Sequence, residues 1–576
     1  MSAWCLVLKV WRVLQCTLNI EEYLFVEPAP SLIRNRLFWF TSLLWLVVMI
    51  LSLWCQPLMN DIDQPHYLSV AWEMWTRHHY LFAISNGLPD NNKPPLLYWF
   101  ILGGWKLFGI SVWWPRFLEV IIGWLCIHQV ARLTKRLSGS VQAQWIVYLL
   151  MYGSYYWFFI MLQIRFDALL TLFTLVAITA LWDFHQRYSV VSAFTFIVAI
   201  TLGLFAKGPF IFVYLLPMAL ALPWTHKKRN FILWYLLIIC FIAASFILPA
   251  IWLHYVQDEL ARDGLVHSVL HKVGGYLHLS FHLPFYIGTL LYTLLPWVTA
   301  LPLWLALRHL KWMTHRDSYL YLLITLLSGF CFAVLLMSHQ AMRYILTAVL
   351  LATAFLAIAL SEYIMAHDQR HRFGFTWLNG ATALLAALFF LTTPFSYRFV
   401  TVNFAFFHVI PWWFAIPALA LAYYQFKCGR KSLHLQLCHA AIGVLCILMV
   451  YQVGFWRYYA PHFNLQAVAK MVEKAQQRGH PILGASYRLW PQRLEFLGRF
   501  PRAIPIETKP DRIKQWAIKH PRGYLVMVTE VDPQNPPAGY VAWQSNVNFG
   551  GRNLFKRKKL RGMGLCRAGA YLQKQC

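Results

Sequence analysis

Long apolar runs separated by short polar connections fill the first four fifths of the chain. Thirteen runs approach the ~20 residues that cross a bilayer as a helix, so the pattern predicts thirteen transmembrane helices. They fall at 38–58, 116–134, 143–161, 168–185, 190–206, 208–224, 231–253, 285–307, 318–337, 343–365, 375–396, 403–425 and 437–456. A fourteenth segment, 95–110, is short for a span and contains Lys106. Hydropathy alone does not decide whether it crosses.

The positions of the basic residues between the runs indicate whether 95–110 crosses the membrane. If 95–110 does not cross, six basic connections share the side of the N-terminus, as expected for loops that stay in the cytoplasm. They are Lys135-Arg136, His185 to Arg187, Lys227 to Arg229, Arg308 to Arg316, His367 to Arg372 and Lys427 to Lys431. The sequence therefore predicts a cytoplasmic N-terminus, a periplasmic C-terminus and an amphipathic helix over 95–110 along the outer face.

Composition agrees with a polytopic membrane protein. The 576 residues are 59% hydrophobic and 12% charged, whereas soluble domains are about half apolar and a quarter charged. The net charge of +28 is dispersed between the apolar runs, which favours membrane orientation and contact with anionic lipids over nucleic-acid binding. The cysteines show no CxxC pair, and Cys566 and Cys576 can form a disulfide if the tail faces an oxidising compartment.

Three regions follow from this pattern: a cytoplasmic segment 1–37, a transmembrane domain 38–458 with an outer loop at 59–115, and a polar tail 459–576. The tail is long enough for a small α/β domain. Helical periodicity covers Leu465–Arg478, and strand-like runs cover Pro481–Tyr487, Leu494–Leu497 and Tyr524–Val528.

The connections predicted at the outer face hold the candidate acids. Asp63 follows the first span and precedes a helix expected from Pro65 to Trp75, so it is a helix cap, a functional carboxylate or both. Asp167 lies between two spans next to Arg165. An acid at membrane depth usually has a function, but a surface ion pair with Arg165 is an equal alternative.

Candidate cations lie in the same outer connections. Lys93 precedes Pro94 and Pro95, and Arg343-Tyr344 begins a span. These side chains could hold a phosphate; alternatively, they could snorkel to lipid headgroups. Lys207-Gly208-Pro209 is predicted to be a tight turn between spans. Four histidines, at 267, 271, 278 and 282, have near-helical spacing without a recognised zinc pattern.

These motifs, taken in order, resemble the bacterial relatives of the protein mannosyltransferases, and among them the aminoarabinose lipid A transferases (ArnT), which are integral-membrane glycosyltransferases of the GT-C fold. The resemblance covers residues 38–350, with a weaker match at Leu494 to Arg499. The matching motifs are Asp63, Lys93 to Trp99, Pro115-Arg116-Phe117, Arg165-Phe166-Asp167, Ala206 to Pro209, His282 to Tyr286 with Leu295-Pro296-Trp297, and Arg343 to Leu346.

The resemblance implies a polyprenyl-phosphate-linked sugar donor, an acceptor such as lipid A at the outer face of the bacterial inner membrane, and inversion at the anomeric carbon. It implies catalytic roles for Asp63 and Asp167. Substrate binding is implied for six further residues: Lys93, Arg116, Arg165, His282, Arg343 and Tyr344. A divalent metal ion is left open, because the acid that often precedes the lysine in this family is Asn92 here.

Two other functions remain open besides sugar transfer to a lipid. The same chemistry could act on a protein or polysaccharide acceptor. A transporter or flippase for a lipid-linked substrate is a different class, and it would commonly show internal repeats and ionisable residues at mid-span. The acids of this chain cluster at one predicted face and no repeat is visible, which favours the transferase.

Overall fold

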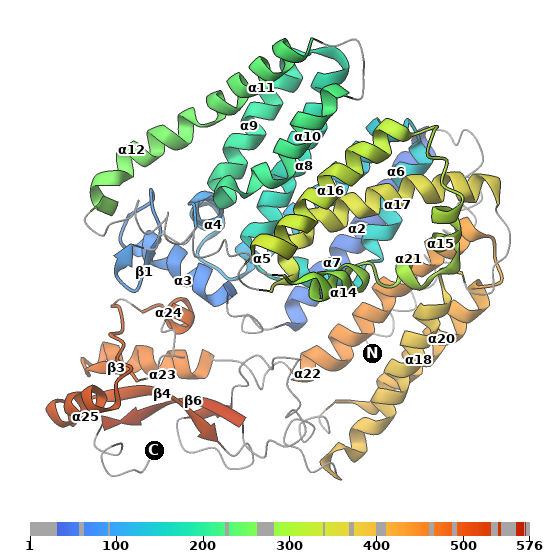
Figure 1. Ribbon diagram of the computed structural model, residues 1–576. Helices are drawn as coiled ribbons and strands as arrows, with labels where there is room; N and C mark the ends of the chain where they lie inside the picture. The colour runs from blue at the N-terminus through green and yellow to red at the C-terminus, as the bar shows by residue number, and fades with distance from the viewer. Residues whose placement is uncertain are drawn as a thin grey trace.

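The computed structural model describes most of the chain as helical, with a small sheet near the C-terminus (Figure 1). The described residues are 31–56, 63–89, 93–224, 230–261, 281–337, 340–367, 374–398, 410–459, 466–485, 492–500, 502–531, 540–542, 560–568 and 571. The first part of the N-terminal segment and the histidines at 267, 271 and 278 lie outside these residues.

The chain is a multi-pass membrane protein. Within the described residues, eight helical segments are long and apolar enough to cross a bilayer. They are Trp113–Ser138, Phe166–Arg187, Val190–Trp224, Phe231–Val256, Arg316–Leu336, Met342–Ala366, Trp377–Phe395 and Leu433–Trp456. The expected run 168–185 corresponds to Phe166–Arg187, whereas the expected runs 190–206 and 208–224 fall within one segment, Val190–Trp224, and 143–161 is not in this set. The count of thirteen stays a prediction.

The helices of the membrane part are as follows: α2 (Ser31–Cys55), α5 (Trp113–Ser138), α6 (Val141–Tyr152), α7 (Tyr155–Met161), α8 (Phe166–Arg187), α9 (Val190–Lys207), η3 (Gly208–Ile211), α10 (Phe212–Ala221), η4 (Leu222–Trp224), α11 (Phe231–Ser245), α12 (Ile247–Ala261), α14 (Leu283–Thr293), η5 (Trp297–Thr299), α15 (Leu301–Arg308), α16 (Arg316–Leu336), η6 (Met342–Ile345), α17 (Leu346–Ala366), α18 (Trp377–Thr392), η7 (Thr393–Arg398), η9 (Trp412–Phe414), α20 (Ala415–Cys428), α21 (Leu433–Tyr451), η10 (Gln452–Trp456) and α22 (Arg457–Tyr459).

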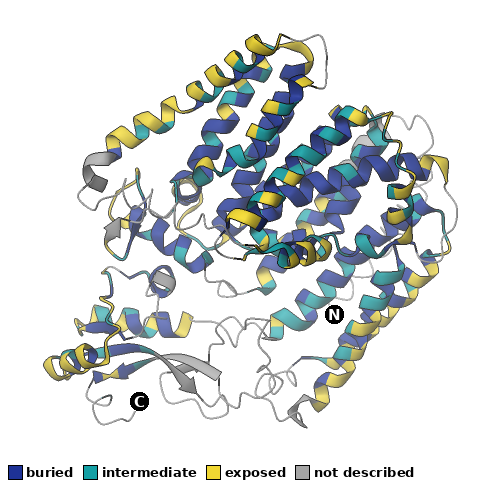
Figure 2. Ribbon diagram, viewed as in Figure 1, coloured by how far each residue is buried: buried dark blue, intermediate teal, exposed yellow. Residues whose placement is uncertain are grey.

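Burial separates inner helices from helices that face lipid. In α17 and its preceding turn, 89% of the most apolar window is buried, because α5, α6, α8, α15 and α16 pack around it. The α11–α12 segment is the most apolar span and only 17% buried, and Figure 2 shows its exposed surface. Apolar helices without protein partners are stable where lipid replaces water.

Several of the expected spans are not single helices, and two of them show why. The run 143–161 divides into α6 and α7 at Gly153-Ser154, where the Ser154 hydroxyl accepts a hydrogen bond from the Trp157 N–H at 3.2 Å. A serine that satisfies a free N–H in this way starts a new helix. The run 285–307 divides into α14, η5 and α15, with prolines at 296 and 302. Apolar runs alone carry no information about such breaks.

The loop after α2 forms a layer of short elements. It contains α3 (Asp63–Thr76), a hairpin of β1 (Ile84–Ser85) and β2 (Leu88–Pro89), and α4 (Leu96–Phe108). The thirteen residues of α4 extend about 20 Å, which is less than a bilayer's ~30 Å hydrocarbon core. Its length agrees with the expected non-crossing helix, and its placement along the outer face stays a prediction.

The tail forms a small α/β unit. Its elements are α23 (Gln466–Gln477), β3 (Ile482–Gly484), α24 (Gln492–Gly498), α25 (Pro510–Lys519), β4 (Tyr524–Val531), β5 (Tyr540–Ala542) and β6 (Leu560–Arg567). The strands lie in the order β3-β4-β6-β5, and only the β3–β4 pair is parallel. Cys566 is disulfide-bonded, but its partner lies outside the described residues, so pairing with Cys576 stays a prediction.

The expected strand at Leu494–Leu497 is wrong, because these residues form α24. This helix packs on α3 and α4: the Phe496 ring stacks on Trp105 with centroids 5.3 Å apart, and the Phe496 N–H donates to the Ser69 hydroxyl at 3.1 Å. A short apolar run can form either a strand or a helix. Here the packing against α3 favours the helix. The tail is therefore fixed to the helix that begins at Asp63.

Candidate active site

Asp63 is the first residue of α3, where a carboxylate complements the positive end of the helix dipole. Its Oδ2 accepts hydrogen bonds from Nη1 of Arg165 at 3.0 Å and from Nη1 of Arg343 at 2.7 Å. Arg165 is held in turn by the Gln163 side chain, whose Oε1 accepts from Nε at 2.9 Å and Nη2 at 2.6 Å. Asp63 is thus fixed between two guanidinium groups from distant parts of the chain.

Asp167 lies in the first turn of α8, and both of its oxygens face cations. Oδ1 accepts from Nζ of Lys207 at 2.5 Å, and Oδ2 lies 3.9 Å from Nε of Arg343. Lys207 reaches Asp167 because α8 and α9 pack against each other as a hairpin, so the end of α9 returns to the start of α8. Gly208 then ends α9 with φ +75°, a conformation in which other residues are strained.

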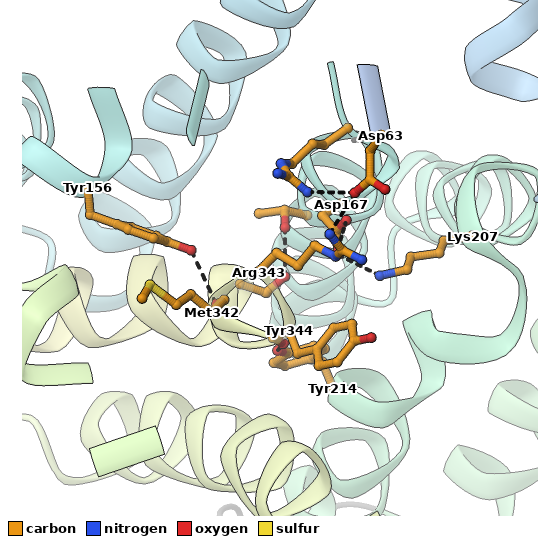
Figure 3. Close-up of polar contacts among 11 residues, drawn as sticks. Asp63, Tyr156, Asp167, Lys207, Tyr214, Met342, Arg343 and Tyr344 are labelled. Atoms are coloured by element: carbon orange, nitrogen blue, oxygen red, sulfur yellow. Dashed lines mark hydrogen bonds and ion pairs between the residues drawn. The ribbon is translucent and has the colours of Figure 1, made fainter. Parts of the chain in front are cut away.

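Arg343 joins the two acids into one cluster. It lies in η6, ahead of the long inner helix α17, and its guanidinium contacts Asp63 and approaches Asp167. Figure 3 shows Asp63, Asp167, Lys207 and Arg343 converging, with Tyr344 beside them. Three helix starts and one helix end therefore supply the charges of a single site.

Lys93 adds a further cation close to this cluster. Burial and the neighbouring Lys207 lower the pKa of Lys93 to about 8, so the ammonium is still mostly protonated at neutral pH. Within the described residues, no carboxylate lies within 4.0 Å of it. Among the described residues, Lys93, Arg165, Lys207 and Arg343 face two carboxylates, and these leave two positive charges for an anion to neutralise.

Two tyrosines border the charged groups. The Tyr344 ring lies 5.3 Å from Nζ of Lys207 and 5.8 Å from the Arg343 guanidinium carbon, at cation–π distance. Tyr67 lies one helical turn after Asp63 on α3 and is buried. Burial, together with the charges of Asp63 and Asp167, raises the pKa of Tyr67 above its usual range. Its hydroxyl therefore stays protonated and can donate a hydrogen bond.

Two of the expected substrate-binding residues have other partners. Nη1 of Arg116 donates to the carbonyls of Leu53 at 3.0 Å and Gln56 at 3.1 Å, at the end of α2. Basic side chains commonly satisfy helix-end carbonyls in this way. His282 precedes α14, and its Nδ1 lies 3.1 Å from Nε2 of Gln340, close to the η6 turn. Substrate contacts of these two residues stay predictions.

Lys207 and Tyr67 were not among the residues predicted from the sequence to bind substrate. The sequence predicts only a tight turn at Lys207. Two consecutive antiparallel helices nevertheless place the end of the second, at Lys207, beside the start of the first, at Asp167. Tyr67 follows Asp63 by four residues, a spacing that places both on one face of a helix.

The described residues contain no group of three or more His, Cys, Asp or Glu side chains that could hold a metal ion. Asn92 and three of the loop histidines lie outside them, so the metal left open by the sequence is not tested there.

Known protein sequences match part of this chain. The family model of the dolichyl-phosphate-mannose-protein mannosyltransferases matches residues 92–252, a segment that includes Lys93, Arg165, Asp167 and Lys207. An uncharacterised protein of Aquifex aeolicus is 25% identical over 154 residues, which is 26% of this chain. The chain covers only 30% of the length of that relative.

Solved structures share the fold over nearly the whole chain. ArnT from Cupriavidus metallidurans in its apo state superposes with a TM-score of 0.67 at 16% identity, covering 92% of this chain and 98% of that one. The same enzyme bound to undecaprenyl phosphate gives a TM-score of 0.65 at 16% identity, covering 91% and 97%. The shared fold and the partial family match agree with the resemblance expected from the motifs: the chain has the ArnT-like fold, and residues 92–252 match the mannosyltransferase family model.

Proposed function

We propose that the chain transfers a sugar from a polyprenyl-phosphate donor to a lipid acceptor of the lipid A type, at the outer face of the bacterial inner membrane. The single observation that carries the proposal is the cluster of two carboxylates and four cations at the ends of apolar helices. Its excess positive charge suits a phosphate, and its position suits a lipid-borne substrate. ArnT from Cupriavidus metallidurans binds undecaprenyl phosphate on the same fold.

The reaction is a displacement at the anomeric carbon. The acceptor oxygen attacks from the side opposite the phosphate, the bond from the anomeric carbon to the phosphate oxygen breaks, and its electron pair stays on that oxygen. Polyprenyl phosphate leaves and the configuration inverts. Negative charge grows on the leaving phosphate, and prepositioned cations stabilise such charge strongly. We assign this role to Lys93, Lys207 and Arg343.

The two acids have different surroundings, which supports different roles. Both oxygens of Asp167 face cations, so we assign Asp167 to positioning Lys207 and Arg343 rather than to contact with the acceptor. Asp63 uses Oδ2 for both arginines, and its Oδ1 has no hydrogen-bond partner among the described residues. We assign Oδ1 to the acceptor, where it takes the proton of the attacking hydroxyl group.

The test uses purified protein, labelled polyprenyl-phosphate sugar and extracted lipid A. Asp63→Asn is expected to lower the transfer rate at least ~100-fold, within the range for loss of a general base, while the protein still folds in the membrane. Asp511→Asn, an exposed acid in the first turn of α25, is the matched control. A fully active Asp63→Asn variant would contradict the catalytic role.

The same labelled donor, supplied to sealed membrane vesicles that contain the protein and envelope proteins and polysaccharides, separates the alternatives. Label that crosses the membrane without forming a new bond indicates a transporter. Label that enters protein or polysaccharide but not lipid A indicates another acceptor. Mass spectrometry of lipid A from cells with and without the chain then tests the acceptor in vivo.

A further inference from the structure

A polar cavity lies far from the candidate active site. It has a volume of about 720 Å³ and is lined by side chains of α5, α8 and α9. Arg132 and Arg136 come from α5, Asp183 and Arg187 from the last turns of α8, and Ser192 from the first turn of α9. Its volume falls within the ~300–1,000 Å³ typical of small-molecule sites.

The cavity and the acids of the active site lie at opposite ends of α8. Asp167 is in the first turn of this helix and Asp183 is sixteen residues further on. At 1.5 Å per residue the two positions are about 24 Å apart. Because α8 is one of the helices long enough to cross the bilayer, the cavity opens near the other membrane surface. It is therefore not an extension of the active site.

The charges that line the cavity are unbalanced. Nη1 of Arg136 pairs with Oδ1 of Asp183 at 3.2 Å. Arg132 and Arg187 have no carboxylate within 4.0 Å among the described residues, and both side chains are exposed. Two positive charges are thus available in a confined space next to the Ser192 hydroxyl. This combination suits an anion that carries oxygen atoms, because arginine binds phosphate in a bidentate manner.

An apolar strip adjoins the cavity. Val191 lines it, and Val190, Val191, Phe194 and Val198 are 83%, 74%, 67% and 36% exposed on one side of α9. Residues at this spacing share a helix face. In a bilayer this face meets acyl chains. The ligand should therefore be amphipathic, with an anionic head in the cavity and hydrocarbon along α9.

From these observations we propose that the cavity between α5, α8 and α9 is a binding site for an anionic phospholipid. The phosphate of the headgroup contacts Arg132 and Arg187, and the acyl chains lie against the exposed face of α9. A free phosphate ion has the same head chemistry, but it would leave the apolar strip unexplained. Basic pockets between membrane helices recognise lipid headgroups by this chemistry.

The test measures thermal unfolding of the purified full-length chain in a neutral detergent. Three probes are compared: short-chain phosphatidylglycerol, short-chain phosphatidylcholine and inorganic phosphate. Phosphatidylglycerol is expected to raise the unfolding temperature more than the other two. In Arg132→Gln/Arg187→Gln, the concentration that gives half of this shift is expected to rise at least ~10-fold, because the charge-assisted hydrogen bonds to the phosphate are lost.

The matched control is Lys427→Gln/Arg430→Gln, which removes two exposed charges from the end of α20, where the sequence predicts the same membrane side. It should respond to phosphatidylglycerol like the unchanged protein. The proposal is overturned if the cavity variant responds equally, if phosphatidylcholine matches phosphatidylglycerol, or if inorganic phosphate alone reproduces the shift. If the double variant does not fold, Arg187→Gln is measured in its place with the same criteria.

Discussion

The buried ion pair between Asp167 and Lys207 allows a quantitative test of the site. Lys207→Met keeps a flexible stem and removes the charge. The Nζ to Oδ1 distance is 2.5 Å, and each side chain is 10% exposed. Removing one partner of a buried pair costs ~3–5 kcal/mol of unfolding free energy. Arg343 lies 3.9 Å from the other oxygen of Asp167 and still compensates part of its charge, so we expect the lower end, about 3 kcal/mol.

Combining Lys207→Met with Asp167→Asn separates stability from function. The double variant removes both charges, so its loss of stability should be smaller than the sum of the single losses by ~1–3 kcal/mol, the coupling typical of contacting residues. Sugar transfer should not recover, because the leaving phosphate still lacks the ammonium. We expect all three variants to transfer sugar ~100-fold more slowly, as after loss of an electrostatic stabiliser.

The assay follows unfolding of the purified variants in detergent by tryptophan fluorescence and measures transfer from labelled donor. Lys106→Met, which removes an exposed charge on α4, controls for the substitution itself. Two results would refute the reasoning: stability losses that add within ~0.5 kcal/mol, which indicate independent residues, or transfer by Lys207→Met at the rate of the control.

Two further predictions concern pH. Because the pKa of Lys93 is lowered to about 8, kcat/KM for the donor should fall as pH rises through about 8, and Lys93→Arg should extend activity to higher pH; an unchanged profile in this variant would exclude Lys93 as the titrating group. In the tail, burial and the adjacent Glu73 raise the pKa of Glu495 to about 9, against a smaller opposite effect of Arg77. The folded protein then holds a proton that the unfolded chain releases above about pH 4.5, so stability should fall between pH 5 and pH 9. Glu495→Gln should flatten this dependence in thermal unfolding, whereas equal slopes for both proteins would contradict it.

Much of the fold could be predicted from the sequence, because hydropathy and charge report directly on the bilayer. The short helix α4 and a helix close to Asp63 follow from the pattern, and the structure has both, although α3 begins at Asp63 and not at the expected Pro65. The breaks at Gly153-Ser154 and in the 285–307 run do not follow, because they depend on local capping inside an apolar run. The helix at Leu494 depends on a tertiary contact with α3, which local sequence does not contain.

The site was predictable to a similar extent. Asp63, Arg165, Asp167 and Arg343 were all named from the sequence, and the structure brings them into one cluster. Which acid contacts which cation was not predictable, because the Arg165–Asp167 pair that the sequence left open competes with partners from other helices. In the structure Arg165 pairs with Asp63, and Lys207 pairs with Asp167. Which ion pairs form depends on how four helix ends meet. The positions of these helix ends are determined by helix packing far from the charged side chains.

The docking of α24 on α3 means that the tail and the loop after α2 cannot be exchanged independently. A chimera joined near residue 459 would bring a foreign α24 against Trp105 and Ser69, which lie on α4 and on the helix that begins at Asp63. Homologues that swap tails should therefore lose turnover even when every membrane helix is native, unless the facing surfaces of α3 and α4 are transplanted with them. Exchange of the tail between homologues therefore has to include α3, α4 and α24 together.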